Sequence, residues 1–133
     1  MSIEGGCLCG KIRYQIAAPL ESAEHCHCSM CRRFHGAAFS SYADFNPDDF
    51  HWLQGEDQLG IYEPNPGKGW AFCKTCGSSL GMPGADGRLT SVALGTVDGD
   101  PGIRPTEHMF VGSKAVWYDI TDDLPQHKTR SNT

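Results

Sequence analysis

The most constraining feature of this sequence is its seven cysteines, which fall into three tight groups. The groups are Cys7-Leu8-Cys9, Cys26-His27-Cys28-Ser29-Met30-Cys31 and Cys73-Lys74-Thr75-Cys76. Because seven is odd, complete pairing into disulfides would leave one thiol over. Thiolates separated by one or two residues instead converge readily on a single tetrahedral metal ion. Division of the cysteines into four plus three predicts one closed metal site and one site with an open position.

Length and composition fit one small domain that is rich in turns. The chain has 133 residues, of which 39% are hydrophobic and 20% charged, with 16 glycines and 8 prolines. These values favour a single globular domain with short elements and little long helix. We predict one zinc-binding domain over residues 1–125 and a flexible tail over the polar residues 126–133.

Charge and targeting signals narrow the choice of partners. The formal net charge is −5, and Arg32-Arg33 is the only adjacent pair of basic residues. A nucleic-acid partner is therefore disfavoured, because the phosphate backbone requires matching basic side chains. No run approaches the roughly 18 apolar residues of a membrane span. Residues 1–10 lack the features of a secretory signal, so we expect a cytoplasmic protein, in which cysteines more often bind metal than form disulfides.

The chain is predicted to be mainly β, with brief helical turns. Ile12, Tyr14 and Ile16 alternate with polar residues, which is typical of a half-buried strand. Further strands are predicted over residues 37–45, 58–62, 69–72, 89–94 and 108–111. Short helical turns are predicted over 46–50, where Asn46 is the cap, and over 28–35, where Gly36 ends the turn. A metal ion joining distant segments would stabilise so small a core.

Cys7, Cys9, Cys73 and Cys76 are predicted to hold a structural zinc ion. Each pair is followed by a glycine that allows the backbone to turn sharply, as in a zinc knuckle. Zinc is preferred over iron because a sulfur-only tetrahedral site suits it. Two alternatives remain, a pair of buried thiols and a redox Cys-x-x-Cys motif. The redox motif would normally open a helix, and the sequence Gly77-Ser78-Ser79 argues against that context.

Cys26, Cys28 and Cys31 are predicted to hold a catalytic zinc ion. Three protein ligands with one exchangeable position are typical of catalytic zinc sites. The exchangeable position can bind a substrate thiol and lower its pKa, or polarise an oxygen. The three cysteines are therefore the candidate catalytic residues, and the site is one that can be partly empty.

Several neighbours of this group are weaker candidates. Three histidines can complete the metal shell or move protons, although a surface or hydrogen-bonding role is commoner for each. Either arginine can steer an anionic substrate, although surface pairing is the better interpretation of one arginine alone. Aromatic side chains can line a pocket, although in a small β domain they are usually core. These candidates are His25, His27, His35, Arg32, Arg33, Phe34, Phe39, Trp70 and Trp117. For His108 and Lys114, placement in a strand and a turn is the safer interpretation.

Four stretches, in this order, resemble the glutathione-dependent formaldehyde-activating enzyme family, which includes centromere protein V-like domains. They are Gly6-Cys7-Leu8-Cys9-Gly10-Lys11-Ile12-Arg13-Tyr14, His25-Cys26-His27-Cys28-Ser29-Met30-Cys31-Arg32-Arg33, Phe72-Cys73-Lys74-Thr75-Cys76-Gly77 and His108-Met109-Phe110-Val111-Gly112-Ser113-Lys114-Ala115-Val116-Trp117-Tyr118. The resemblance runs from about residue 5 to 125, and the ordered set is highly specific.

The resemblance implies a zinc-stapled, Mss4-like fold of short twisted antiparallel sheets. It implies the same division of ligands, with four cysteines on a structural zinc and three on a catalytic zinc. It also implies a carbon–sulfur lyase that joins glutathione to formaldehyde as S-hydroxymethylglutathione. The substrates would be a small thiol and an aldehyde, with the identity of both left open.

Two other functional classes remain for this sequence. One is a non-catalytic zinc domain that binds another protein, as Mss4-like relatives suggest. The other is a thiol redox or metal-handling protein, in which the three spare cysteines would be the working part. The intact three-cysteine group counts against a purely structural module.

Overall fold

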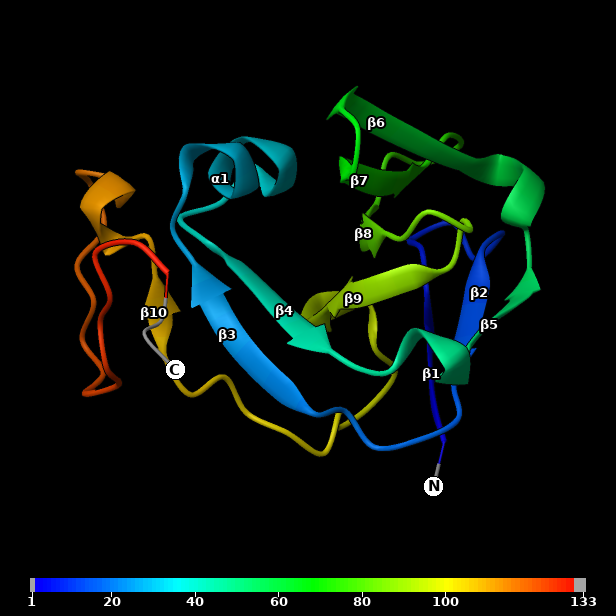
Figure 1. Ribbon diagram of the computed structural model, residues 1–133, viewed down its shortest axis with the longest axis horizontal. Helices are drawn as coiled ribbons and strands as arrows, with labels where there is room; N and C mark the ends of the chain where they lie inside the picture. Colours follow the sequence, from blue (N-terminus) through cyan, green and yellow to red (C-terminus); the bar gives the residue numbers. More distant parts are fainter. Residues whose placement is uncertain (1, 131–133) are drawn as a thin grey trace.

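The computed structural model describes residues 2–130 and folds them into two β-sheets with one short α-helix (Figure 1). The smaller sheet has three antiparallel strands in the order β1-β2-β5. Their bounds are Ile3–Gly6 for β1, Arg13–Ile16 for β2 and Phe50–Gln54 for β5. The predicted mainly β fold of short strands is confirmed.

The larger sheet has seven strands in the order β10-β3-β4-β9-β8-β7-β6 within the described chain. All neighbours are antiparallel except β10 and β3, which run parallel. The bounds are Ser22–Cys26 for β3, Ser40–Asp44 for β4, Leu59–Asn65 for β6, Lys68–Cys73 for β7, Ser79–Pro83 for β8, Leu89–Ala93 for β9 and His108–Met109 for β10.

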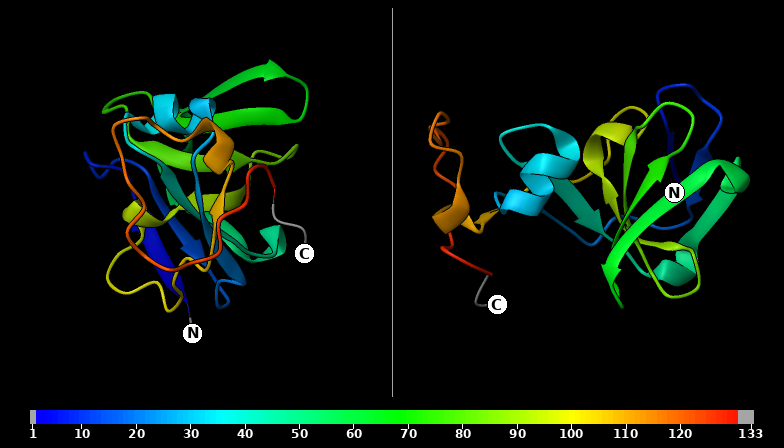
Figure 2. Two further views of the ribbon diagram at one scale, coloured as in Figure 1. Left: turned by 90° about the vertical axis from the view of Figure 1, so that its left-hand side faces the viewer. Right: turned by 90° about the horizontal axis from the view of Figure 1, so that it is seen from above.

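The helical segments are brief, as predicted. Helix α1 spans Ser29–His35, begins at the Cys28 cap and ends at Gly36, whose φ of 60° is left-handed. Asn46 caps the 3₁₀ turn η1, as its side chain accepts a hydrogen bond from the Asp48 N–H at 3.0 Å. The 3₁₀ turns are Pro47–Asp49 for η1, Glu56–Gln58 for η2, Leu94–Thr96 for η3 and Val111–Ser113 for η4. In Figure 1 and in the right-hand view of Figure 2, α1 lies between the chain after β10 and the β6–β7 hairpin.

The main core lies between the two sheets. Tyr14 and Phe50 stack with their ring centroids 5.6 Å apart. Because side chains alternate along a strand, the larger sheet has a second face. Ala43 and Val92 join the main core, whereas their neighbours Tyr42 and Ala93 join a small cluster with Cys26 and Cys31 beneath α1. The sheet therefore separates two apolar environments.

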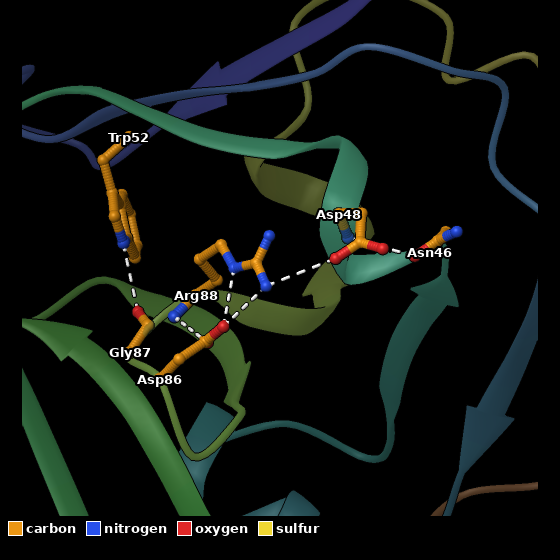
Figure 3. A network of polar contacts seen from close by, with 6 residues as sticks. All are labelled: Asn46, Asp48, Trp52, Asp86, Gly87 and Arg88. Atoms are coloured by element: carbon orange, nitrogen blue, oxygen red, sulfur yellow. Dashed lines mark hydrogen bonds and ion pairs between the residues drawn. The ribbon is translucent and has the colours of Figure 1, made fainter.

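A polar network ties the small sheet to the turn between β8 and β9 (Figure 3). Arg88 donates to Asp86 at 2.8 Å and forms a longer ion pair with Asp48 at 3.4 Å. The Trp52 indole N–H donates to the carbonyl of Gly87 at 3.1 Å. The charged groups are exposed, so solvent screens the ion pairs and they contribute little to stability. The network links the segment around β5 to the turn before β9.

The chain after β10 folds back along that strand. The N–H of His127 donates to the His108 carbonyl at 2.8 Å, and the N–H of Phe110 donates to the Thr129 carbonyl at 2.8 Å. Residues 126–129 of the predicted flexible tail are thus hydrogen-bonded, while residues 131–133 lie outside the described part of the chain. Within residues 2–130, no helix has the length and apolar character needed to cross a membrane.

Candidate metal centres and the pocket between them

The structure brings Cys7, Cys9, Cys73 and Cys76 together, with their Sγ atoms all within 4.8 Å of one another. The Cys7 and Cys9 sulfurs are 3.5 Å apart, and the Cys9 and Cys73 sulfurs are 3.9 Å apart. Four sulfurs at about 2.3 Å from a tetrahedral zinc ion would lie roughly 3.8 Å from each other. A disulfide requires about 2.05 Å. The spacing therefore fits a metal-binding set.

Two similar turns place these thiols. Gly10 and Gly77 adopt left-handed φ values of 82° and 79°. Their N–H groups donate back to the carbonyls of Cys7 at 3.1 Å and Cys73 at 2.8 Å. The Ile12 N–H donates to the Cys7 sulfur at 3.3 Å, which favours the thiolate form. The glycines following each pair thus form the predicted knuckles.

Ser78 links the two turns. Its hydroxyl accepts from the Leu8 N–H at 2.8 Å and lies 3.2 Å from the Cys76 sulfur. Hydrogen bonds from the Ser78 hydroxyl and backbone N–H lower the pKa of the Cys76 thiol to about 5. Cys73 is fully buried and belongs to the main core. The four-cysteine site therefore lies where the first loop meets the core.

The structure also brings Cys26, Cys28 and Cys31 together, with sulfurs within 4.8 Å of one another. Cys26 ends β3, Cys28 caps α1, and Cys31 lies in the first turn of α1. The Cys31 N–H donates to the Cys28 sulfur at 3.3 Å. Hydrogen bonds from the Cys26 and Cys31 thiols lower the pKa of Cys28. Among residues 2–130, no fourth histidine, cysteine or carboxylate joins the set. This arrangement fits a metal site with one position open to a ligand.

A buried chain of hydrogen bonds supports the loop that carries Cys26 and Cys28. His27, fully buried between them, places Nε2 at 2.8 Å from His108 Nδ1. His108 Nε2 lies 3.0 Å from the Asp122 carboxylate, whose pKa is lowered by that contact. An ionised carboxylate only accepts, so His108 donates to Asp122 and accepts from His27. The chain fixes the position of His27 and of the cysteine on either side.

The other candidate histidines are engaged away from the thiols. His25 Nδ1 lies 2.8 Å from the Ser41 hydroxyl, and His35 Nε2 lies 2.6 Å from the Tyr42 hydroxyl. Burial lowers the pKa of both imidazoles. Neither His25 nor His35 joins the three thiols in the described structure. They stabilise the surroundings of the site.

Both cysteine groups lie at the same end of the larger sheet. Cys26 ends β3 and faces Ser40 at the start of β4, while Cys73 ends β7 beside the start of β8. A polar pocket of about 540 Å³ opens there. Its walls come from α1, the starts of β4 and β8, and the turn η3, and they include Phe34, Phe39, Ser40, Ser78 and Thr96. The pocket thus reaches residues that contact each cysteine group.

Ser40 is the polar side chain of this pocket that is most deeply placed. It is 2% exposed and neighbours the Cys31 thiol. Its hydroxyl is buried, and the neighbour with which it interacts is the Cys31 thiol. Ser40 therefore lies between the polar pocket and the three-cysteine group.

A second, apolar pocket of about 380 Å³ lies on the other side of Phe34. It is lined by α1 and the β6–β7 hairpin, and includes Trp70 and Arg33. Of the four aromatic residues predicted as pocket candidates, Phe34 lines both pockets, Phe39 the polar one and Trp70 the apolar one. Trp117 is 69% exposed and lines neither.

The sequence interpretation missed Asp122, Ser40 and Ser78. Asp122 and Ser40 are distant in sequence from every cysteine, and only the pairing of β10 with β3 and of β4 with β3 brings them near. Ser78 carries a local signal, since it follows Gly77 directly after the second knuckle. His108 was assigned to a strand, which is correct, but its buried contact with His27 had no sequence signal.

A fold of two β-sheets with cysteine groups of four and three defines a class of small domains built around metal-binding thiols. Comparison with known proteins identifies the family. The profile of the glutathione-dependent formaldehyde-activating enzyme family matches residues 2–113. The chain belongs to this family.

One named relative and one solved structure are similar to this chain. A Halomonas elongata protein named "Putative glutathione-dependent formaldehyde-activating enzyme" is 28% identical over 132 residues, covering 90% of this chain and 82% of that protein. A crystal structure of a Rhodobacter sphaeroides protein superposes with a TM-score of 0.55 at 25% identity. That match covers 73% of this chain and 89% of the other.

Proposed function

We propose that this protein is a zinc-dependent enzyme that forms or cleaves the adduct between a thiol and an aldehyde. The observation that supports it most is the convergence of three thiols, without a fourth ligand in the described chain, beside a polar pocket. The family name and the name of the Halomonas elongata relative supply the substrate class, with glutathione as the candidate thiol and formaldehyde as the candidate aldehyde.

The two cysteine groups have different roles in this proposal. Cys7, Cys9, Cys73 and Cys76 hold a structural zinc ion, since four thiols complete its tetrahedral shell. Cys26, Cys28 and Cys31 hold the catalytic zinc ion. A zinc ion held there would lower the pKa of a coordinating substrate thiol and so favour its thiolate form at neutral pH.

The reaction is an addition and its reversal. The thiol sulfur adds to the aldehyde carbon, the carbon–oxygen π bond breaks, and the oxygen gains the proton that the thiol loses. No oxidant or reductant is consumed, and the reverse reaction breaks the carbon–sulfur bond while the carbonyl re-forms, which makes the activity a carbon–sulfur lyase activity. The protein binds the thiol in the polar pocket, which Ser40 lines beside the Cys31 thiol.

The proposal includes a cytoplasmic setting. Thiols that serve as metal ligands must stay reduced, and reducing compartments maintain that state. All seven cysteines are unpaired in the structure, in agreement with such a setting.

The test is the exchange between glutathione and formaldehyde, followed by NMR exchange spectroscopy on zinc-loaded protein. The protein should speed formation of S-hydroxymethylglutathione above the spontaneous rate. Cys28→Ala should reduce that acceleration by at least about 100-fold, because it removes a ligand of the open site. Ser29→Ala, one residue away and exposed, serves as the matched control and should keep the activity.

Circular dichroism decides whether the loss is local. Cys28→Ala should keep the wild-type spectrum, because the site lies outside the main core. Wild-type rates in Cys28→Ala, or a wild-type protein that does not exceed the spontaneous rate, would overturn the proposal.

A further inference from the structure

We propose that the apolar pocket between α1 and the β6–β7 hairpin binds a small hydrophobic carboxylate. This pocket is separate from the polar pocket assigned to the thiol, and the two share only the wall formed by Phe34. The inference does not depend on the proposed reaction, because no cysteine lines the apolar pocket in the described structure.

The shape and lining of the pocket suit a small organic ligand. Its volume of about 380 Å³ lies within the usual range of ligand sites, which are mostly apolar with a few polar groups. Tyr62 and Trp70 stack with ring centroids 6.4 Å apart, and Phe34 lies 6.3 Å from Trp70. Tyr62 is 62% exposed and Met30 is 43% exposed. Apolar groups of this size left open around a hollow indicate a ligand more than a folded core.

One buried donor in this pocket has no acceptor. Trp70 is 6% exposed, and its indole N–H finds no hydrogen-bond partner among the described residues. A buried indole N–H is normally paired, because leaving it unpaired costs free energy. The indole nitrogen has almost no accessible surface, so the Trp70 side chain must shift for a ligand oxygen to reach it. After that shift, an acceptor on an otherwise apolar ligand would satisfy the indole N–H.

Arg33 at the edge of the pocket indicates that the acceptor group of the ligand is negatively charged. Arg33 lines the pocket and is exposed, and it takes part in no ion pair within residues 2–130. Guanidinium binds a carboxylate through two parallel hydrogen bonds, which are stronger than bonds between neutral groups. The chain as a whole carries a net charge of −5. Arg33 nevertheless gives this apolar pocket a local positive charge, which favours the binding of an anion.

Together these groups define the ligand class. The aromatic walls bind a hydrophobic body, the Trp70 N–H bonds an oxygen, and Arg33 pairs with a carboxylate. An uncharged hydrophobic ligand would form no ion pair with Arg33. A small hydrophilic anion would leave the aromatic side chains of the pocket exposed to water. A hydrophobic carboxylate uses all three.

The experiment compares two probes of equal shape on the intact, zinc-loaded protein. The probes are 3-phenylpropionate and its neutral amide, 3-phenylpropanamide, and binding is measured by titration calorimetry and by Trp fluorescence. The carboxylate should bind about tenfold more tightly than the amide, which corresponds to about 1.4 kcal/mol. Equal binding of the two probes, or no binding of either at millimolar concentration, would refute the proposal.

Two variants locate the site. Arg33→Gln should reduce carboxylate affinity about tenfold and leave amide affinity unchanged. Trp70→Phe keeps the ring but removes the N–H, and should weaken both probes about threefold. Lys128→Gln removes one exposed positive charge outside the pocket and is the matched control, with no expected effect. If Lys128→Gln weakens the carboxylate as much as Arg33→Gln does, binding is non-specific and the proposal fails.

A second copy of the chain is the other occupant to test. Sedimentation velocity at increasing protein concentration would detect it. The proposal expects a sedimentation coefficient that does not change when Arg33 is replaced by Gln. Self-association that this substitution abolishes would show that a second chain fills the pocket, and would overturn the proposal.

Discussion

The four-cysteine and three-cysteine groups use the same side chain at the same end of one sheet, yet they are built differently. The first joins two loops that are far apart in sequence and lies against the main core through Cys73. The second comes from one six-residue stretch at the junction of β3 and α1, on the opposite face. The first has a full set of ligands, while the second lacks one. This difference supports the proposed roles, in which the group that spans the chain holds the fold together and the local, incomplete group binds a ligand.

The largest expected effect comes from removing one thiol in each group. Cys73→Ala should lower the free energy of unfolding by more than about 4 kcal/mol, because it removes a buried ligand that links distant segments. Cys28→Ala should lower it by less than about 2 kcal/mol. Urea unfolding monitored by circular dichroism measures both. A greater loss in Cys28→Ala than in Cys73→Ala would reverse the roles assigned to the two groups.

Metal release should separate the two groups in time. A chelator can reach an open coordination position but not a filled shell, so zinc should leave the three-cysteine site at least about tenfold faster. The colour change of a zinc indicator follows the release. The Cys28→Ala protein should show the slow phase alone. One tightly held zinc per chain, with three freely alkylated thiols, would instead favour a redox or binding role.

The hydrogen bonds from His27 through His108 to Asp122 should affect zinc binding at the three-cysteine site alone. Asp122→Ala leaves His108 without its acceptor, and should weaken zinc binding at the three-cysteine site about tenfold. The four-cysteine site should keep its affinity. Asp123→Ala removes an exposed carboxylate one residue away and is the control. Equal effects of Asp122→Ala and Asp123→Ala on the fast phase of zinc release would rule out the positioning role of Asp122.

The smallest effects concern the glycines that end each turn. Gly77 follows the second knuckle at φ 79°, and Gly36 ends α1 at φ 60°. Replacement of either by Ala should cost about 1 kcal/mol in urea unfolding, because an alanine is strained in the left-handed region. Gly95 has an ordinary φ and open space around it, so Gly95→Ala should change stability by less than about 0.5 kcal/mol. A cost at Gly95 equal to that at Gly77 would refute the backbone explanation.

Local patterns were sufficient to predict much of this molecule. The alternation around Tyr14 marks β2, and Cys28 and Gly36 mark the two ends of α1. The grouping of the cysteines predicted which sulfurs meet, because thiols one to three residues apart converge with little backbone rearrangement. Even the joining of Cys7 and Cys9 with Cys73 and Cys76 follows from counting, since three of the seven are already grouped.

Other features depend on pairing between distant strands and gave no local signal. Strands β1, β3, β5 and β8 were not predicted, since Gly5-Gly6, Glu24-His25, Gln54 and Gly81 break the alternation that identifies a strand. The position of Ser40 beside the Cys31 thiol and the contact of Asp122 with His108 exist because β4 and β10 flank β3. Sequence spacing cannot place such groups.

The parallel pairing of β10 with β3 has a consequence for the order in which the protein is assembled on the ribosome. All four sulfurs of the structural group lie at or before residue 76, so the nascent chain can bring them together before His108 and Asp122 have left the exit tunnel. His27 gains its hydrogen-bonded support only when those two residues have emerged. The four-sulfur group can therefore assemble before the three-cysteine group acquires its support.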